Sequence, residues 1–96
     1  FSFIYIYIYL YCTIEIEEFY AFPELRELWL GCNQITRLPE LQLVNLQVFC
    51  ASSNKLLSLK GLEKCARLQE CIVDGNQLSV IEPLYGLEHL HVVDVS

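Results

Sequence analysis

The chain has 96 residues, of which 54% are hydrophobic and 19% are charged, so it can form one small domain with a packed core. Four glycines and three prolines exclude a collagen-like or low-complexity protein. Twelve acidic residues against six basic ones give a formal net charge of −6, and we therefore expect no nucleic-acid partner. The sequence contains no methionine, from which we expect that it is part of a longer product.

The first twelve residues alternate between aliphatic and aromatic side chains. Ile or Leu occupies positions 4, 6, 8 and 10, and Tyr occupies positions 5, 7, 9 and 11. A period of two places the aliphatic side chains on one face of a strand. The run is too short for a membrane helix, which needs roughly 20 apolar residues. A signal-peptide remnant is the alternative, but no basic segment precedes the run and no small-residue cleavage site follows it. We predict a strand and no membrane span.

One pattern occurs three times in the rest of the chain. Residues 25–35, 46–56 and 68–78 each follow Leu-x-x-apolar-x-apolar-x-x-Asn-x-apolar, and a fourth copy begins at Leu90. The copies are 21 and 22 residues apart, which is the signature of a repeat architecture. The asparagines that the three copies share are Asn33, Asn54 and Asn76.

We predict a single domain over residues 1–96 that consists of these repeats. In the opening strand either Tyr11 or Cys12 takes the asparagine position; the first alternative places Ile6 and Ile8 inside, and we prefer it. The predicted units are a degenerate N-terminal repeat at 1–24, full repeats at 25–45, 46–67 and 68–89, and a truncated repeat at 90–96.

The pattern has a physical explanation in which each repeat forms one turn of a coil. Apolar residues two apart, such as Leu28 and Leu30, point inward from a short strand that pairs in parallel with its neighbours. The asparagine amide can bond backbone groups that the following turn leaves unpaired. Apolar residues then recur in steps of three, which suits a short helix or 3-10 turns. We predict an α/β solenoid with a parallel sheet on the concave side and short helical or 3-10 turns on the convex side.

The repeats resemble the leucine-rich-repeat family. Their length and the pattern after each asparagine are similar to the 22-residue intracellular subclass that includes the regulatory subunit of protein phosphatase 1. An axonemal dynein light chain, a splicing-factor subunit and bacterial internalins have similar repeats. The resemblance covers residues 25–96 well and 13–24 weakly. It implies a non-catalytic scaffold that binds another protein.

A partner of such a solenoid usually binds the concave sheet, so the strand positions that do not face the core are the candidate contacts. Trp29 is the best single candidate, because Trp is enriched among interface hot spots. The alternatives are that Trp29 only covers the neighbouring strands and that the acids form a solvated face. We expect a basic or mixed partner segment. The predicted contact residues are Glu27, Trp29, Val48, Cys50, Glu70, Ile72, Asp74 and Asp94.

Cysteines and histidines give no sign of a catalytic or metal site. The five cysteines include no Cys-x-x-Cys pair, and Cys65 and Cys71 fall on core positions. Secreted leucine-rich-repeat proteins usually carry cysteine-rich caps, so we expect a cytoplasmic protein. His89 and His91 lack a third ligand at suitable spacing, and no phosphate-binding loop is present. We expect no cofactor, no metal and no enzymatic activity.

Three functions stay open at this point. The first is a protein-interaction module, for which the resemblance favours a regulatory role like that of the phosphatase subunit. The second is a structural component of a large assembly such as an axonemal complex, and the third is an extracellular recognition domain or adhesin. Residues 1–12 would form a flat apolar edge strand, which we expect to be covered by a cap, another chain or a second copy through self-association.

Overall fold

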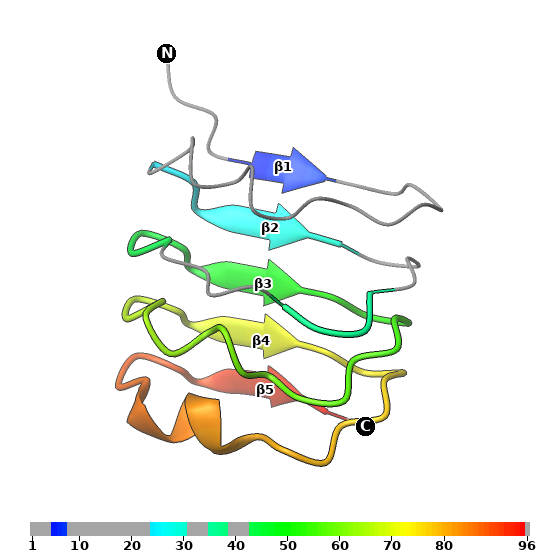
Figure 1. Cartoon of the computed structure of the whole chain (residues 1–96). Helices are drawn as coiled ribbons and strands as arrows, with labels where there is room; N and C mark the ends of the chain where they lie inside the picture. Colours follow the sequence, from blue (N-terminus) through cyan, green and yellow to red (C-terminus); the bar gives the residue numbers. More distant parts are fainter. Residues whose placement is uncertain (1–4, 8–23, 31–34, 39–42, 96) are drawn as a thin grey trace.

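The computed structural model describes residues 5–7, 24–30, 35–38 and 43–95. Within these ranges the chain forms five short strands and one 3-10 helix (Figure 1). Each strand begins 21 or 22 residues after the one before it. The elements are β1 (Tyr5–Tyr7), β2 (Glu27–Trp29), β3 (Val48–Cys50), β4 (Glu70–Ile72), η2 (Glu82–Gly86) and β5 (Val92–Asp94).

The strands form one parallel sheet in the order β1-β2-β3-β4-β5, which is their order in the sequence. The parallel sheet with few helical residues is the α/β architecture that the sequence predicts. Figure 1 shows the strands side by side and pointing the same way, with the described return segments joining β3 to β4 and β4 to β5. Because every neighbour is also the next strand along the chain, no connection has to pass over an intervening strand.

Alternate strand residues bury their side chains on one face of the sheet. Leu28, Phe49 and Cys71 lie in one register row and are each 0% exposed. The next inward residue, such as Leu30 on β2, is also fully buried. Burying one such aliphatic or aromatic side chain stabilises the fold by about 1.5–3 kcal/mol. These strand residues share one core with the buried residues of the return segments, so those segments cover this face.

The return segments turn in steps of three. Backbone N–H groups of Leu62, Cys65 and Leu68 each donate to the carbonyl three residues earlier. Bonds of this spacing form single 3-10 turns, and they keep the apolar residue of each step on the inner side. In the last return segment the turns join into η2, where Pro83 lies in the first turn and needs no N–H partner.

β1 is aligned with β2 so that Ile6 pairs with Leu28. This is the register that follows when Tyr11, rather than Cys12, takes the asparagine position. Both of those residues lie outside the described ranges, as do Asn33 and the rest of the opening run from position 8 onwards. Within the described ranges, no helix has the length and apolar character that a membrane span requires.

Candidate functional site

Among the described residues, the buried side chains of the return segments pack on the core face of the sheet, and the strand side chains on the opposite face of β2 to β5 are half-buried or exposed, with the exception of Cys50. Two register rows cross this face from β2 to β5: one runs through Glu27, Val48, Glu70 and Val92, and the other through Trp29, Cys50, Ile72 and Asp94. We call this surface the open face. It consists of Glu27, Trp29, Val48, Cys50, Ser52, Glu70, Ile72, Asp74, Val92 and Asp94.

The apolar part of the open face lies at its centre. The side chains of Trp29, Val48 and Ile72 are each half-buried, so part of their apolar surface contacts solvent. Trp29 and Ile72 occupy the same row on β2 and β4, on either side of β3. Three strands therefore contribute to one apolar strip, which is the feature expected of a contact surface rather than of scattered surface residues.

The Trp29 ring is held in place by a neighbouring carboxylate. Its indole Nε1–H donates to Glu27 Oε1 at 3.0 Å, between two residues on the same face of β2. Buried or half-buried Trp N–H groups need such an acceptor. Glu27 therefore positions the ring as well as adding negative charge.

Cys50 departs from the sequence prediction. The sequence places it among the contact residues, but its side chain is only 7% exposed. Its row neighbours are Trp29 and Ile72, and both are larger than cysteine, so they enclose the thiol between them. A partner on the open face would contact these neighbours and not Cys50.

A second polar contact joins two adjacent strand ends. The Ser52 hydroxyl donates to Asp74 Oδ1 at 2.6 Å, and the Cys50 Sγ lies 3.4 Å from the same hydroxyl oxygen. The short Ser–Asp bond fixes one carboxylate oxygen of Asp74 at the edge of the apolar strip. Ser52 is not among the predicted contact residues, although the repeat pattern already places it level with Asp74, since each lies two residues before its repeat's asparagine; the bond between them is seen only in the structure.

The charge of the open face has one sign. Its ionisable side chains are the carboxylates of Glu27, Glu70, Asp74 and Asp94, and none of the six basic residues occupies one of its positions. The bases lie elsewhere; Arg67, for example, donates to the Asn45 side chain between two return segments. Carboxylates around an apolar strip favour a cationic partner.

Asn54 and Asn76 lie just after β3 and β4, and their side chains connect successive repeats. The Asn54 amide donates to the carbonyls of Leu30, Ala51 and Ser52, and its Oδ1 accepts from the Ile35 N–H at 3.2 Å. Asn76 makes the equivalent four bonds in the next repeat. Each asparagine therefore bonds backbone groups of its own repeat and of the repeat before it. These bonds give both side chains a structural role and leave neither available to bind a ligand.

Cys65 and Cys71 are protonated thiols near neutral pH. Burial raises the pKa of Cys65 to about 11 and that of Cys71 to about 12, against an ordinary value of 9.0. Desolvation is the main cause for both residues. Thiolates are the reactive form, so neither side chain is suited to nucleophilic chemistry near neutral pH.

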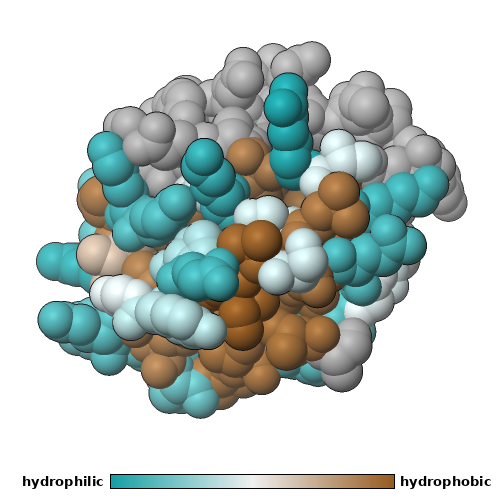
Figure 2. Space-filling view, turned by 60° about the horizontal axis from the view of Figure 1, so that its bottom comes forward, coloured by the Kyte–Doolittle hydropathy of each residue, from teal (hydrophilic) through white to brown (hydrophobic). Residues whose placement is uncertain are grey.

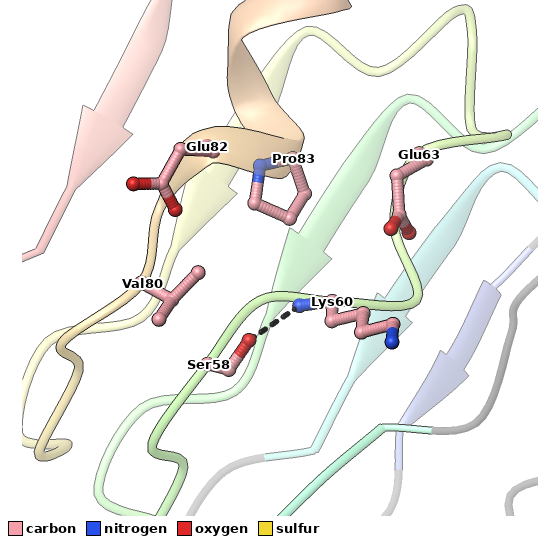
Figure 3. A pocket seen from close by; sticks show the side chains of 6 residues that line it. All are labelled: Ser58, Lys60, Glu63, Val80, Glu82 and Pro83. Atoms are coloured by element: carbon pink, nitrogen blue, oxygen red, sulfur yellow. Dashed lines mark hydrogen bonds between the residues drawn. The ribbon is translucent and has the colours of Figure 1, made fainter.

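A hollow of about 490 Å³ lies away from the sheet, between the segment after Asn54 and η2 (Figure 3). Ser58 and Val80, which are joined by an isolated parallel bridge, form part of its wall. The hollow is open to solvent and combines one lysine with two glutamates. The other residues that line it are Lys60, Glu63, Glu82 and Pro83.

The histidines lie beside β5. His91 Nδ1 is 3.2 Å from the backbone oxygen of His89, and both side chains are exposed. In the part of the chain that the structure describes, no group of three or more His, Cys, Asp or Glu residues is arranged to hold a metal ion.

No protein-family model matches the chain, and no curated protein matches its sequence.

Proposed function

We propose that the chain is a leucine-rich-repeat solenoid whose open face is the concave side. Three features support this proposal: the strand spacing of 21 or 22 residues, the register that aligns equivalent residues of successive strands, and the matching bonds of Asn54 and Asn76. In such a coil each unit buries its inner face only against its neighbours. The 22-residue intracellular subclass is the part of the family that the repeats resemble.

We propose that the protein is a non-catalytic protein-interaction module that binds a basic partner segment on the open face. The observation that carries this proposal is the half-exposed strip of Trp29, Val48 and Ile72 among carboxylates, with no base on the same face. The repeats resemble those of the regulatory subunit of protein phosphatase 1. This resemblance favours a module that regulates the activity of the enzyme it binds. Three buried cysteines that form no disulfide within the described residues support a cytoplasmic location.

The roles of the residues follow from their positions. Trp29 and Ile72 supply the apolar contact area, and the Glu27 bond limits the entropy that the Trp29 ring loses on binding. The carboxylates of Glu70, Asp74 and Asp94 attract a cationic segment and set its orientation. Binding should therefore weaken as ionic strength increases, because salt screens exposed charges.

The experiment uses the single tryptophan as its reporter. Peptides are selected from a random-sequence display library on the immobilised protein and then titrated while Trp29 fluorescence is recorded. We expect the selected peptides to combine Lys or Arg with apolar residues. For these peptides, Ile72→Ala should raise the Kd by more than fivefold, which is about 1 kcal/mol.

Leu57→Ala is the matched control, because Leu57 is 53% exposed but lies outside the open face. It should leave the Kd unchanged. The double variant Trp29→Ala with Ile72→Ala is tested by calorimetry, since it lacks the fluorophore. Equal affinity of the folded double variant and the unaltered protein would contradict the proposal. A pull-down with the purified catalytic subunit of protein phosphatase 1 tests the regulatory role separately.

A further inference from the structure

The apolar strip of Trp29, Val48 and Ile72 lies in the middle of the sheet and not at its end. Figure 2 shows the β5 end, where hydrophobic residues gather with hydrophilic ones around them. The strip belongs instead to β2, β3 and β4, and each of these strands has a neighbour on both sides. The partial exposure of its three side chains is therefore a property of the open face itself.

The strip runs across the strands. Trp29, Cys50 and Ile72 are successive partners in one register row of β2, β3 and β4. Val48 lies in the adjacent row, on the same strand as Cys50. Neighbouring strands are about 4.8 Å apart, so Trp29 and Ile72 are about 9.6 Å apart along the row. A partner segment that contacts both side chains has to cross three strands.

These intervals match the repeat of an α-helix. Side chains on one face of a helix recur after three, four and seven residues, which is about 4.5, 6 and 10.5 Å along its axis. Three or four residues therefore span about one strand spacing, and seven residues span about two. In an extended segment, side chains on one face recur about every 6.7 Å. If one of them contacts Trp29, the next falls short of Ile72 and the one after it lies beyond Ile72.

Backbone hydrogen bonding gives an extended segment no advantage on this surface. A segment that adds itself to a sheet as a further strand uses the edge of the sheet, where backbone groups are unpaired. On the open face of β2, β3 and β4 the backbone groups already bond to the neighbouring strands. The side-chain spacing therefore decides which conformation fits.

Carboxylates lie on both sides of the strip. Glu70 lies two residues before Ile72 along the chain, and Asp74 lies two residues after it. Their backbone positions are thus about 6.7 Å to either side of the row. A helix with its side chains is about 10–12 Å wide, so basic residues on both of its flanks can reach these carboxylates. The Ser52 hydroxyl donates to Asp74 at 2.6 Å and holds that carboxylate beside the strip.

We infer that the partner segment is an amphipathic α-helix that lies across β2, β3 and β4. Apolar residues at i, i+4 and i+7 form its contact stripe, and the first and last of them contact Trp29 and Ile72, in either order. Basic residues flank the stripe on both sides at the Ile72 end, where Glu70 and Asp74 lie. This inference rests on the function proposed above, to which it adds the conformation and the residue pattern of the partner.

Two designed peptides of the same composition test the inference by titration of Trp29 fluorescence. In the first, leucines occupy i, i+4 and i+7, and lysines flank them on a helix. In the second, leucines and lysines alternate, so that the leucines share one face only in an extended conformation. We expect the helical-pattern peptide to bind at least tenfold more tightly, and the far-UV circular dichroism of its complex to show added helix. Equal or tighter binding of the alternating peptide would overturn the inference and leave the proposed function standing. Failure of both peptides to bind would contradict both.

Double-mutant cycles locate the helix on the open face. Each peptide leucine is replaced by alanine and titrated by calorimetry against the unaltered chain, Trp29→Ala and Ile72→Ala. We expect the leucines that couple to Trp29 and Ile72, by at least threefold in Kd, to lie seven residues apart. Leu57→Ala, outside the open face, is the matched control and should couple to no leucine. Coupling of one leucine to both side chains, or of none to either, would overturn the inference. Ile72→Val replaces Ile72→Ala if circular dichroism shows that the latter is unfolded.

Discussion

At the scale of single residues, Asn54 stabilises the fold through its side-chain hydrogen bonds. Its side chain is 6% exposed, and its four bonds involve backbone groups of two adjacent repeats. These groups lie where the chain leaves the sheet and where no strand partner is available. A buried polar group left unpaired costs about 1–3 kcal/mol.

We predict that Asn54→Ala lowers the free energy of unfolding by about 3 kcal/mol, because alanine satisfies none of these groups. Asn76→Ala should cost less, since Asn76 is only half-buried and water can replace some of its bonds. Urea unfolding followed by far-UV circular dichroism measures both. Equal losses in the two variants would show that burial does not set the cost.

Cys65 and Cys71 make stability depend on pH at the alkaline end. Their pKa values in the folded protein, about 11 and about 12, exceed the ordinary value of 9.0. Above pH 9 the unfolded chain releases these protons and the folded chain keeps them. The unfolded state then binds fewer protons, so the free energy of unfolding falls as pH rises from about 9.

We predict a loss of up to about 1.4 kcal/mol per pH unit for each thiol between pH 9 and 11. The double variant Cys65→Ala with Cys71→Ala should lack this part of the slope, although it starts from a lower stability. The two proteins share every other ionisable residue, so the difference between the two unfolding curves isolates the two thiols. Parallel curves would rule out the thiols as the cause.

At the scale of elements, the turn after β4 depends on a glycine. Gly75 has a φ of +74°, which side-chain-bearing residues rarely adopt. A Cβ added there would lie 3.2 Å from the backbone nitrogen of Ser53 in the preceding turn. That nitrogen donates to the Asp74 carbonyl at 2.9 Å, so the two turns are already in direct contact.

We predict that Gly75→Ala destabilises the protein by about 1–2 kcal/mol through backbone strain and crowding. Gly86→Ala is the matched control, because nothing lies within 4 Å of its added Cβ. It should be neutral or stabilise by up to about 1 kcal/mol. Thermal unfolding of both variants measures the difference. A Gly75→Ala protein as stable as Gly86→Ala would show that the turn tolerates a side chain.

At the scale of the whole molecule, burial is uneven along the sheet. Strands with a neighbour on both sides hold fully buried residues such as Phe49 and Cys71, whereas Val93 on the end strand β5 is 46% exposed. The net charge of −6 is unevenly placed too, since the bases lie off the open face. The described part of the molecule thus has an acidic face with an apolar strip at its centre.

The sequence alone determined the strands, the spacing and the core. The period of two across Leu28 and Leu30 and the recurrence every 21 or 22 residues specify which side chains are buried, because both reflect backbone geometry that local sequence controls. The position of Cys71 in the core follows from the same pattern. The half-exposed positions of Trp29 and Ile72 on the other face follow from it as well.

Only the tertiary structure decided what depends on neighbours across the sheet. Cys50 is enclosed because the register places it between Trp29 and Ile72, and no single strand contains that information. The Ser52–Asp74 bond joins residues 22 positions apart and has the same origin. The exposure of Val93 depends on the strand that β5 lacks. The position of a residue along its own strand decides on which face of the sheet its side chain lies. The side chains of the adjacent strands decide how much of that side chain remains exposed to solvent.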